Sequence, residues 1–263
     1  MTDAPHRLAD LGVIVVAAGR GERLGAGTPK AFTELGGRTL IEHAVRTVSA
    51  LSEPGQLVLV VSEARAAEAL DIAAAVPLDS RWTVSIAHGG RERHESVRFG
   101  IEALHDGIRT VLVHDAARPL TPPEVFERVA AAVRRTGQSA VPAVAVADTL
   151  KERGEGGTVS ATVDRSALVA VQTPQGFPLD VLAAAHQTAQ EREGGASDDD
   201  APTDDAELVQ RAGGTVHLVE GSPYAHKLTR PADLLMLEGL LAGAAGAPHG
   251  ARGAHARTEE GSR

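Results

Sequence analysis

The sequence contains no cysteine among its 263 residues. This absence excludes disulfide bonds, thiolate metal sites and a cysteine nucleophile, and it fits a reducing compartment. Aromatic residues are also scarce, with one Trp, one Tyr and four Phe. So few aromatic rings argue against the stacking platform that binds single-stranded nucleic acid, and we do not expect a nucleic-acid-binding protein.

Long hydrophobic runs are missing as well. The apolar run at residues 13–18 follows Asp3 and Asp10 rather than a basic region, and it is too short to span a membrane. No targeting segment stands out, and we expect a cytoplasmic protein.

Several well-known catalytic signatures are absent. There is no G-x-x-x-x-G-K-[ST] pattern, which disfavours a P-loop NTPase, and no G-x-S-x-G nucleophile elbow. The spacing of Gly19, Gly21 and Gly25 misses G-x-G-x-x-G by one residue, which disfavours a dehydrogenase. The eleven histidines show no metal-ligand spacing.

The net charge of −9 is concentrated in one segment. Residues 191–207 hold eight acids and one base, which together supply −7. The rest of the chain is nearly neutral, with its basic residues in clusters. The overall acidity therefore does not argue against an anionic substrate.

Short β-branched runs alternate with amphipathic helical patterns along the first half of the chain. The predicted strands are residues 13–17, 57–61, 84–87, 111–114 and 140–146. Thr121 is expected to cap a helix whose first turn holds Pro122 and Glu124. This β-α-β rhythm predicts an α/β fold, with a mostly parallel twisted sheet and helices on both faces.

The rhythm breaks after Val146. Residues 147–172 carry a Gly-rich turn between two extended segments, which predicts a projecting β-arm. A helix from Leu179, a helix at 204–212, a strand at 216–219 and a final helix at 231–241 are expected to follow. We predict one domain over residues 10–242, a mobile acidic insert at 193–202 and a disordered tail at 243–263.

The first predicted strand leads into a Gly-rich loop followed by two cations. In an open parallel sheet, ligands bind at the carboxyl ends of the strands. Small residues such as Ala18 and Gly19 let the backbone approach a phosphate, while Arg23 and Lys30 add positive charge. Such a loop also fits a simple strand-to-helix turn, but the two cations favour phosphate binding.

Two further clusters follow the third and fourth strands at the same expected edge. Gly89 and Gly90 permit close approach to a planar base, and Ser96 can bond its polar edge; a helix cap beside solvated charges is the alternative. Asp115 could hold magnesium or its water shell, and Arg118 a phosphate. The alternative for this pair is a helix-capping Asp with a surface Arg.

Between about residues 13 and 241 the chain carries, in this order, the segments AAGRGERLG with TPK, GGRERHESV, HDAARP, DTLK, VDR, QTPQGF, TDDAELV and HKLTRPADL. This ordered set of motifs resembles the 2-C-methyl-D-erythritol 4-phosphate cytidylyltransferase family of the non-mevalonate isoprenoid pathway. The resemblance implies a Rossmann-like nucleotidyltransferase fold and transfer of CMP from CTP, with Mg²⁺ held mainly by the CTP phosphates. It also implies a homodimer whose β-arms cross to the partner.

The resemblance assigns roles position by position. The residues that match nucleotide contacts are Ala17, Ala18, Gly19, Gly90, Arg91, Ser96 and Ala116. Of these, Gly90, Arg91 and Ser96 match the residues at the cytosine. The residues that match catalytic cations are Arg23, Lys30 and Lys227. The residues that match acceptor contacts are Asp115, Arg118, Thr149, Arg165 and Thr173, with Arg165 reaching the neighbouring subunit's substrate and Asp115 a candidate metal contact.

One departure and three alternatives remain. Ala225 and His226 precede Lys227 where the family often has Asn-Ile, so the triphosphate itself is expected to hold most of the metal's coordination sphere. A ribitol-5-phosphate cytidylyltransferase would share these motifs and the reaction. A non-catalytic nucleotide-binding module could share the fold, although the paired cations argue against it. Fusion to a further enzyme domain is not expected after residue 241.

Overall fold

The computed structural model describes residues 9–19, 29–192 and 202–246. Within these ranges the chain forms one eight-stranded sheet in the order β10-β7-β11-β6-β1-β4-β5, with β12 also paired to β7. The strands are β1 (Leu11–Val16), β4 (Gln56–Val61), β5 (Thr83–His88), β6 (Thr110–Asp115), β7 (Ser139–Ala145), β10 (Val169–Val171), β11 (Gln175–Pro178) and β12 (Val216–Glu220). The neighbours β5, β4, β1 and β6 are all parallel, whereas β10 and β11 run antiparallel to their partners.

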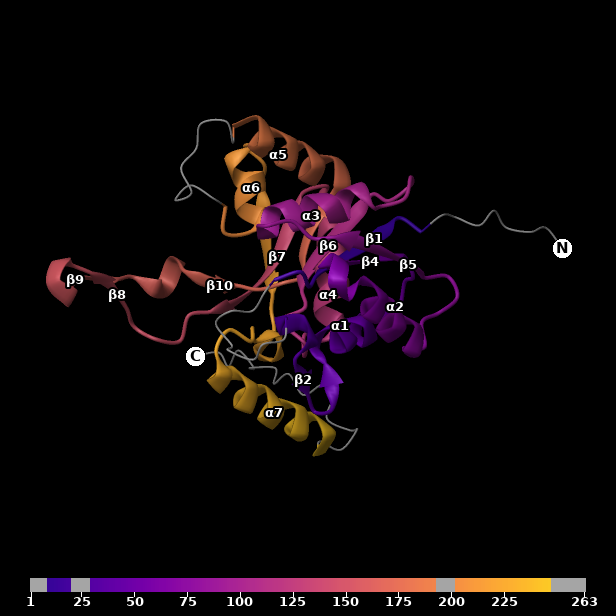
Figure 1. Cartoon of the computed structure of the whole chain (residues 1–263). Helices are drawn as coiled ribbons and strands as arrows, with labels where there is room; N and C mark the ends of the chain where they lie inside the picture. Colours follow the sequence, from indigo (N-terminus) through magenta and orange to yellow (C-terminus); the bar gives the residue numbers. More distant parts are fainter. Residues whose placement is uncertain (1–8, 20–28, 193–201, 247–263) are drawn as a thin grey trace, which may run out of the picture.

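Helices cover both faces of the sheet (Figure 1), and alternate side chains of the central strands belong to different apolar cores. In β1, Val13 and Val15 belong to one apolar core, and Ile14 between them belongs to the other. The first core is completed by α1 (Leu40–Ser49), α2 (Ala66–Ala75) and α4 (Pro123–Thr136). The second is completed by α3 (Arg93–Glu102), α5 (Leu179–Arg192) and α6 (Asp205–Arg211). The prediction of a mostly parallel sheet with helices on both faces is confirmed.

The carboxyl ends of the central strands are held level by backbone hydrogen bonds. Val16 lies opposite Asp115 in the register of β1 and β6. The N–H of Ala17 donates to Val60 at 2.8 Å, that of Gly89 to Val61 at 2.9 Å, and that of Ala116 to Val16 at 3.1 Å. The three predicted ligand-binding loops therefore leave the sheet along one edge.

The predicted β-arm is present as a hairpin of β8 (Leu150–Arg153) and β9 (Val159–Val163), which projects from the main sheet (Figure 1). Gly156 and Gly157 turn the hairpin with φ of 65° and 80°, a region that glycine occupies without steric cost. The prediction extended the arm to residue 172, but Val169–Val171 already forms β10 of the main sheet.

The last helix, α7 (Pro231–Gly246), packs beside the small hairpin of β2 (Glu34–Leu35) and β3 (Arg38–Thr39). A third apolar cluster of Leu35, Leu40, Leu228 and Leu237 joins them. The helix continues beyond the predicted end at residue 241, so the tail expected from 243 was placed too early. Residues 247–263, and residues 193–201 of the expected acidic insert, lie outside the described residues. Within the described helices, none combines the length and apolar character needed to cross a membrane.

The predicted cap of α4 is wrong. The helix begins at Pro123 with Pro122 as its N-cap, and the Thr121 hydroxyl donates to the carbonyl of Arg118 at 3.0 Å instead. A residue that precedes proline is excluded from the helical region, so Pro122 must stay extended before Pro123, at φ −66° and ψ 147°. The first helical position is therefore one residue later than the sequence pattern suggested.

Candidate active site

The loop after β1 and the loop after β5 are in contact at Gly89. A Cβ added to Gly89 would lie 2.1 Å from the Cβ of Ala18, a distance that no real pair of side chains adopts. The backbone after β5 is therefore pressed against the backbone after β1. This contact brings the predicted phosphate loop, Ala17 to Gly19, beside the predicted base-reading loop.

Ser96 fixes the shape of the base-reading loop. Its buried hydroxyl accepts from the N–H of Gly90 at 3.0 Å and donates to the carbonyl of Glu92 at 3.1 Å. The hydroxyl proton is thus already committed, and one oxygen lone pair is left to accept from a ligand amino group. The backbone N–H of Arg91 donates to the Glu95 carboxylate at 2.7 Å, and Nη2 of its side chain lies 3.5 Å from the same carboxylate. The Arg91 side chain is 90% exposed, so it extends into solvent.

We expect Gly89→Ala to weaken CTP binding by about 10-fold or more, because the new methyl group would force the two loops apart. Isothermal titration with CTP measures the effect. Gly239→Ala is the matched control, since a Cβ there meets nothing within 4 Å and the helix α7 should tolerate it. Equal CTP affinity in the two variants would contradict the close packing of the loops.

Asp115, at the end of β6, is the centre of the third cluster. Its Oδ2 accepts from Lys227 Nζ at 2.7 Å and its Oδ1 from Arg93 Nε at 3.1 Å. Its N–H donates to the Thr173 hydroxyl at 3.1 Å. Burial alone would raise the pKa of Asp115, but the charges of Arg93 and Lys227 outweigh burial and hold the pKa well below its ordinary value. Asp115 is therefore an anion that gathers cations from distant parts of the chain.

Thr173 joins this cluster through a second contact. Its hydroxyl oxygen lies 3.1 Å from Nδ1 of His114, which is fully buried beneath the sheet edge. Burial is the main reason that the pKa of His114 falls to about 4, so the imidazole is neutral near pH 7. His114 thus orients Thr173 and adds no charge to the site.

Arg118 ties the loop after β6 to two other segments. Its Nη1 donates to the carbonyl of Ala225 at 2.7 Å and its Nη2 to that of Val171 at 3.3 Å. Burial lowers the pKa of Arg118, and Asp115 opposes that effect. Among the described residues, Nε of Arg118 is buried without a hydrogen-bond partner. The guanidinium therefore braces the Lys227 loop and the end of β10, and it keeps its charge close to Asp115.

The loop that carries Lys227 is also held from its far side. The Asp233 carboxylate, in the first turn of α7, accepts from the N–H and hydroxyl of Thr229, both at 2.6 Å, and from the N–H of Arg230 at 2.7 Å. These hydrogen bonds, that of the Thr229 hydroxyl first, hold the pKa of Asp233 well below its ordinary value. The backbone of Leu228 completes the brace by donating to Ala117 at 2.8 Å.

The remaining predicted residues are placed as follows. Lys30 opens the 3-10 helix Lys30–Phe32, whose Ala31 and Phe32 are buried in the first core. Its position relative to a bound triphosphate stays a prediction, and Arg23 lies outside the described residues. Thr149 is exposed immediately before β8, at the root of the arm.

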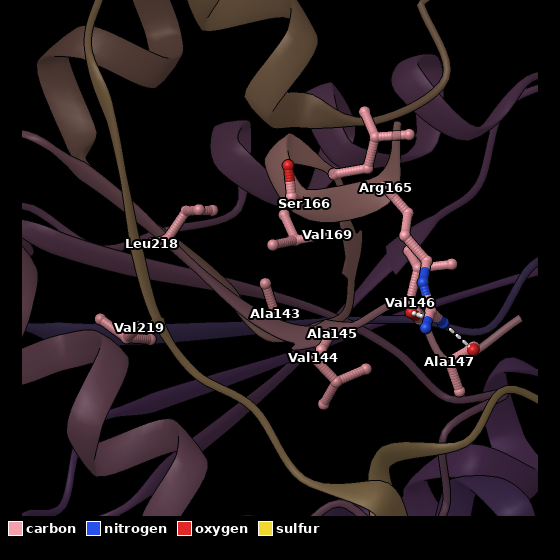
Figure 2. A pocket seen from close by; sticks show the side chains of 11 residues that line it. Ala143, Val144, Ala145, Val146, Ala147, Arg165, Ser166, Val169, Leu218 and Val219 are labelled. Carbon is pink, nitrogen blue, oxygen red and sulfur yellow. Dashed lines mark hydrogen bonds between the residues drawn. The ribbon is translucent and has the colours of Figure 1, made fainter. Parts of the chain in front are cut away.

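Arg165 lies on the arm as well, at the rim of a groove. Its guanidinium donates to the carbonyls of Val146, at 3.0 Å, and Ala147, as Figure 2 shows. The groove holds about 650 Å³ and is lined by the second half of β7, the start of β10 and part of β12. In this single chain, Thr149 and Arg165 belong to the arm rather than to the cluster around Asp115.

Two residues at the site were missed by the sequence interpretation. Arg93 was quoted in a motif without a role, because a run of alternating charges looks solvent-exposed. Asp205, quoted in T-D-D-A-E-L-V, is fully buried and accepts from Arg93 Nη1 at 2.6 Å. The sequence signal was a pair of adjacent aspartates at the start of a helix. A helix needs only one of them as its cap, so the second, Asp205, could have been assigned another role.

The protein offers few oxygen ligands for a metal. Among the described residues, no group of three His, Asp or Glu side chains has the arrangement of a metal site. Asp115 is the candidate carboxylate, and both of its oxygens already accept from cations. This donor set suits a Mg²⁺ ion carried by phosphates, with Asp115 contributing at most one oxygen or a water contact.

Comparisons with known proteins identify the family of the chain. The family model for IspD, 2-C-methyl-D-erythritol 4-phosphate cytidylyltransferase, matches residues 11–242. The chain is 47% identical over 229 residues to the protein of that name from Frankia casuarinae, covering 87% of this chain and 80% of the relative. It is 45% identical over 246 residues to a bifunctional enzyme IspD/IspF from Clavibacter michiganensis, covering 94% of this chain but only 57% of that relative.

A solved structure gives the same result for the fold. The 4-diphosphocytidyl-2C-methyl-D-erythritol synthase from Anaerococcus prevotii superimposes with a TM-score of 0.75 at 25% identity, covering 89% of this chain and 99% of that one. The chain therefore has the fold of a Rossmann-like nucleotidyltransferase, with helices on both faces of the sheet and the ligand loops at the carboxyl ends of its strands. Within that class, the chain belongs to the IspD family of cytidylyltransferases.

Proposed function

We propose that the protein transfers CMP from CTP to 2-C-methyl-D-erythritol 4-phosphate in isoprenoid precursor synthesis. The products are 4-diphosphocytidyl-2-C-methyl-D-erythritol and pyrophosphate. The observation that carries the proposal is the meeting of Lys227, Arg93 and Arg118 around Asp115, at the sheet edge where the Ala18 and Gly89 loops touch. Membership of the family supports the substrate pair. Cytoplasmic location stays a prediction from the sequence.

The proposed reaction is a single in-line displacement. An oxygen of the acceptor phosphate attacks the α-phosphorus of CTP, the bond to the bridging oxygen of the β-phosphate breaks, and pyrophosphate leaves. Two anions must be brought together, so positioning and charge neutralisation are the main tasks of the protein. Amides after β1 would cradle the triphosphate, and Lys227, with Lys30 and Arg23, would stabilise charge around the α-phosphoryl group.

Magnesium is part of the proposal. The CTP phosphates, with Asp115, would hold the ion, and the ion would supply positive charge that offsets the charge of the leaving group. Asp115 would orient Lys227 toward the phosphates and contribute an oxygen or a water contact to the ion. The protein itself would preorganise Asp115 and Lys227 before the substrates bind.

We also propose a homodimer in which the arm of each subunit reaches the partner's site. Thr149 and Arg165 lie on the arm, apart from the Asp115 cluster. Apolar side chains are exposed along the arm and its groove, among them Val159 at 62% and Leu218 at 57%. Such surface is expected to be covered by another chain.

Pyrophosphate release in the presence of CTP tests the function directly. We expect turnover with 2-C-methyl-D-erythritol 4-phosphate and Mg²⁺, and little with ribitol 5-phosphate. Preference for ribitol 5-phosphate would reassign the acceptor. CTP binding without pyrophosphate release from either acceptor would indicate a non-catalytic nucleotide-binding module instead.

A further inference from the structure

We propose that Asp205 is a positioning residue, which shares Arg93 with Asp115 and thereby leaves one oxygen of Asp115 for Lys227. The inference rests on the proposed function only in so far as Asp115 and Lys227 serve the reaction. Asp205 lies on α6, and its contact with the site is made through Arg93, as far as the described part of the chain shows.

The geometry is a chain of four alternating charges. Asp205 Oδ2 accepts from Arg93 Nη1 at 2.6 Å, Arg93 Nε donates to Asp115 Oδ1 at 3.1 Å, and Lys227 Nζ donates to Asp115 Oδ2 at 2.7 Å. Asp205 is completely buried, whereas the Lys227 side chain is 39% exposed. The chain therefore runs from a buried anchor on α6 to an accessible ammonium group.

Arg93 is divided between two carboxylates. A guanidinium group has a planar fork that can bind one carboxylate through two parallel bonds. Here the fork is split, because Asp205 takes Nη1 and Asp115 takes only Nε. If Asp205 lost its charge, Arg93 could turn and bind both oxygens of Asp115. Asp115 would then no longer hold Lys227 in place.

The burial of Asp205 supports a role in holding Arg93 in position. Burial by itself would raise the pKa of Asp205, yet the charge of Arg93, assisted by His186, lowers it below the ordinary value. Nε2 of His186 lies 3.4 Å from the other oxygen of Asp205, Oδ1. Asp204 beside it performs the usual helix-capping role by accepting from the N–H of Glu207 at 2.8 Å. Asp205 is therefore not needed as the cap of α6.

The test compares Asp205→Asn with Val209→Ala. Both residues are fully buried on α6, but Val209 is an apolar side chain of the second core. We expect Asp205→Asn to lower kcat about 10- to 100-fold, the usual effect of removing an outer partner of a site, with a much smaller change in the KM for CTP. Val209→Ala should lose thermal stability and keep kcat within about twofold.

A second variant covers the case in which Asp205→Asn does not fold. Arg93→Lys keeps the charge and loses the fork, so it cannot bind both carboxylates and should show the same loss of kcat. Normal kcat in Arg93→Lys would overturn the proposal, as would a loss of kcat in Val209→Ala equal to that in Asp205→Asn.

A readout independent of activity follows the position of Lys227 itself. The sequence contains three lysines, Lys30, Lys151 and Lys227, so ¹³C-methylation of lysine gives a simple NMR spectrum, and Lys227→Ala assigns the Lys227 signal. We expect this signal to move in Asp205→Asn and to stay in Val209→Ala; an unmoved signal in Asp205→Asn overturns the proposal. If the unmodified enzyme releases no pyrophosphate, the proposed function fails, while the NMR comparison still decides the role of Asp205.

Discussion

Lys227→Ala is expected to reduce kcat for pyrophosphate release by about 10²–10³-fold while the protein stays folded. Lys227 Nζ is held 2.7 Å from Asp115 at the edge where the ligand loops converge, and its side chain is still 39% exposed. A preorganised cation of this kind stabilises charge that develops in the transition state, and its loss costs about 2.7–4 kcal/mol of that stabilisation. Single-turnover kinetics with saturating CTP and acceptor measure the chemical step.

The matched control is Arg81→Ala, which removes a cation next to the start of β5, at the opposite edge of the sheet. Arg81 is 59% exposed and pairs with Asp79, so its loss should leave turnover unchanged. Both variants should retain a cooperative thermal transition. A Lys227→Ala enzyme that turns over at the rate of Arg81→Ala would remove Lys227 from the mechanism.

Arg165→Ala is expected to raise the KM for the acceptor phosphate about 10- to 100-fold, if the arm completes the neighbouring site. A hydrogen bond to a charged group is worth about 1.5–3 kcal/mol, which sets this range. Within one chain, Arg165 donates only to carbonyls at the root of its own arm, Val146 and Ala147, as far as the described residues show (Figure 2). In the proposed dimer, the phosphate contact of Arg165 would therefore be made to a second subunit.

Subunit mixing shows whether the arm serves the partner's active site or the active site of its own subunit. Differently tagged Arg165→Ala and Lys227→Ala chains are co-expressed, and the mixed dimer is purified through both tags. In a two-fold dimer with crossed arms, one site receives both intact residues, and we expect about half of the unmodified activity. If each arm served its own subunit, both sites would be damaged and the mixed dimer would be as slow as the single variants. A monomer by light scattering would contradict the crossed-arm arrangement at the outset.

The sheet was predictable because each strand is encoded by a short run of neighbouring apolar residues. Runs such as Leu57 to Val61 are apolar on both sides, as a strand buried between two helix layers must be. Parallel neighbours then place all their carboxyl ends together, so the convergence of Asp115 with the glycine loops followed from strand order alone. The Gly-turned hairpin was predictable for the same reason, since its signal lies within a few residues.

The charge chain was not predictable from local sequence. Arg93 and Asp205 are 112 residues apart, and the contact between them depends on how α3 and α6 pack over the same face of the sheet. The partners of Arg118 could not be predicted from local sequence either. A cation after a strand indicates phosphate binding, but two of its nitrogens donate to backbone carbonyls from distant segments. Side-chain partners of this kind are set by tertiary packing and become visible only in three dimensions.

The central claim is that one edge of the sheet binds a nucleoside triphosphate. A crystal structure of the protein with CTP and Mg²⁺ tests it most directly. We expect the phosphates between the Ala18–Gly19 amides and Lys227, with the cytosine against Gly89, Gly90 and Ser96. CTP seated in the groove beside Arg165, or at the opposite edge of the sheet without contact to Lys227, would contradict the account.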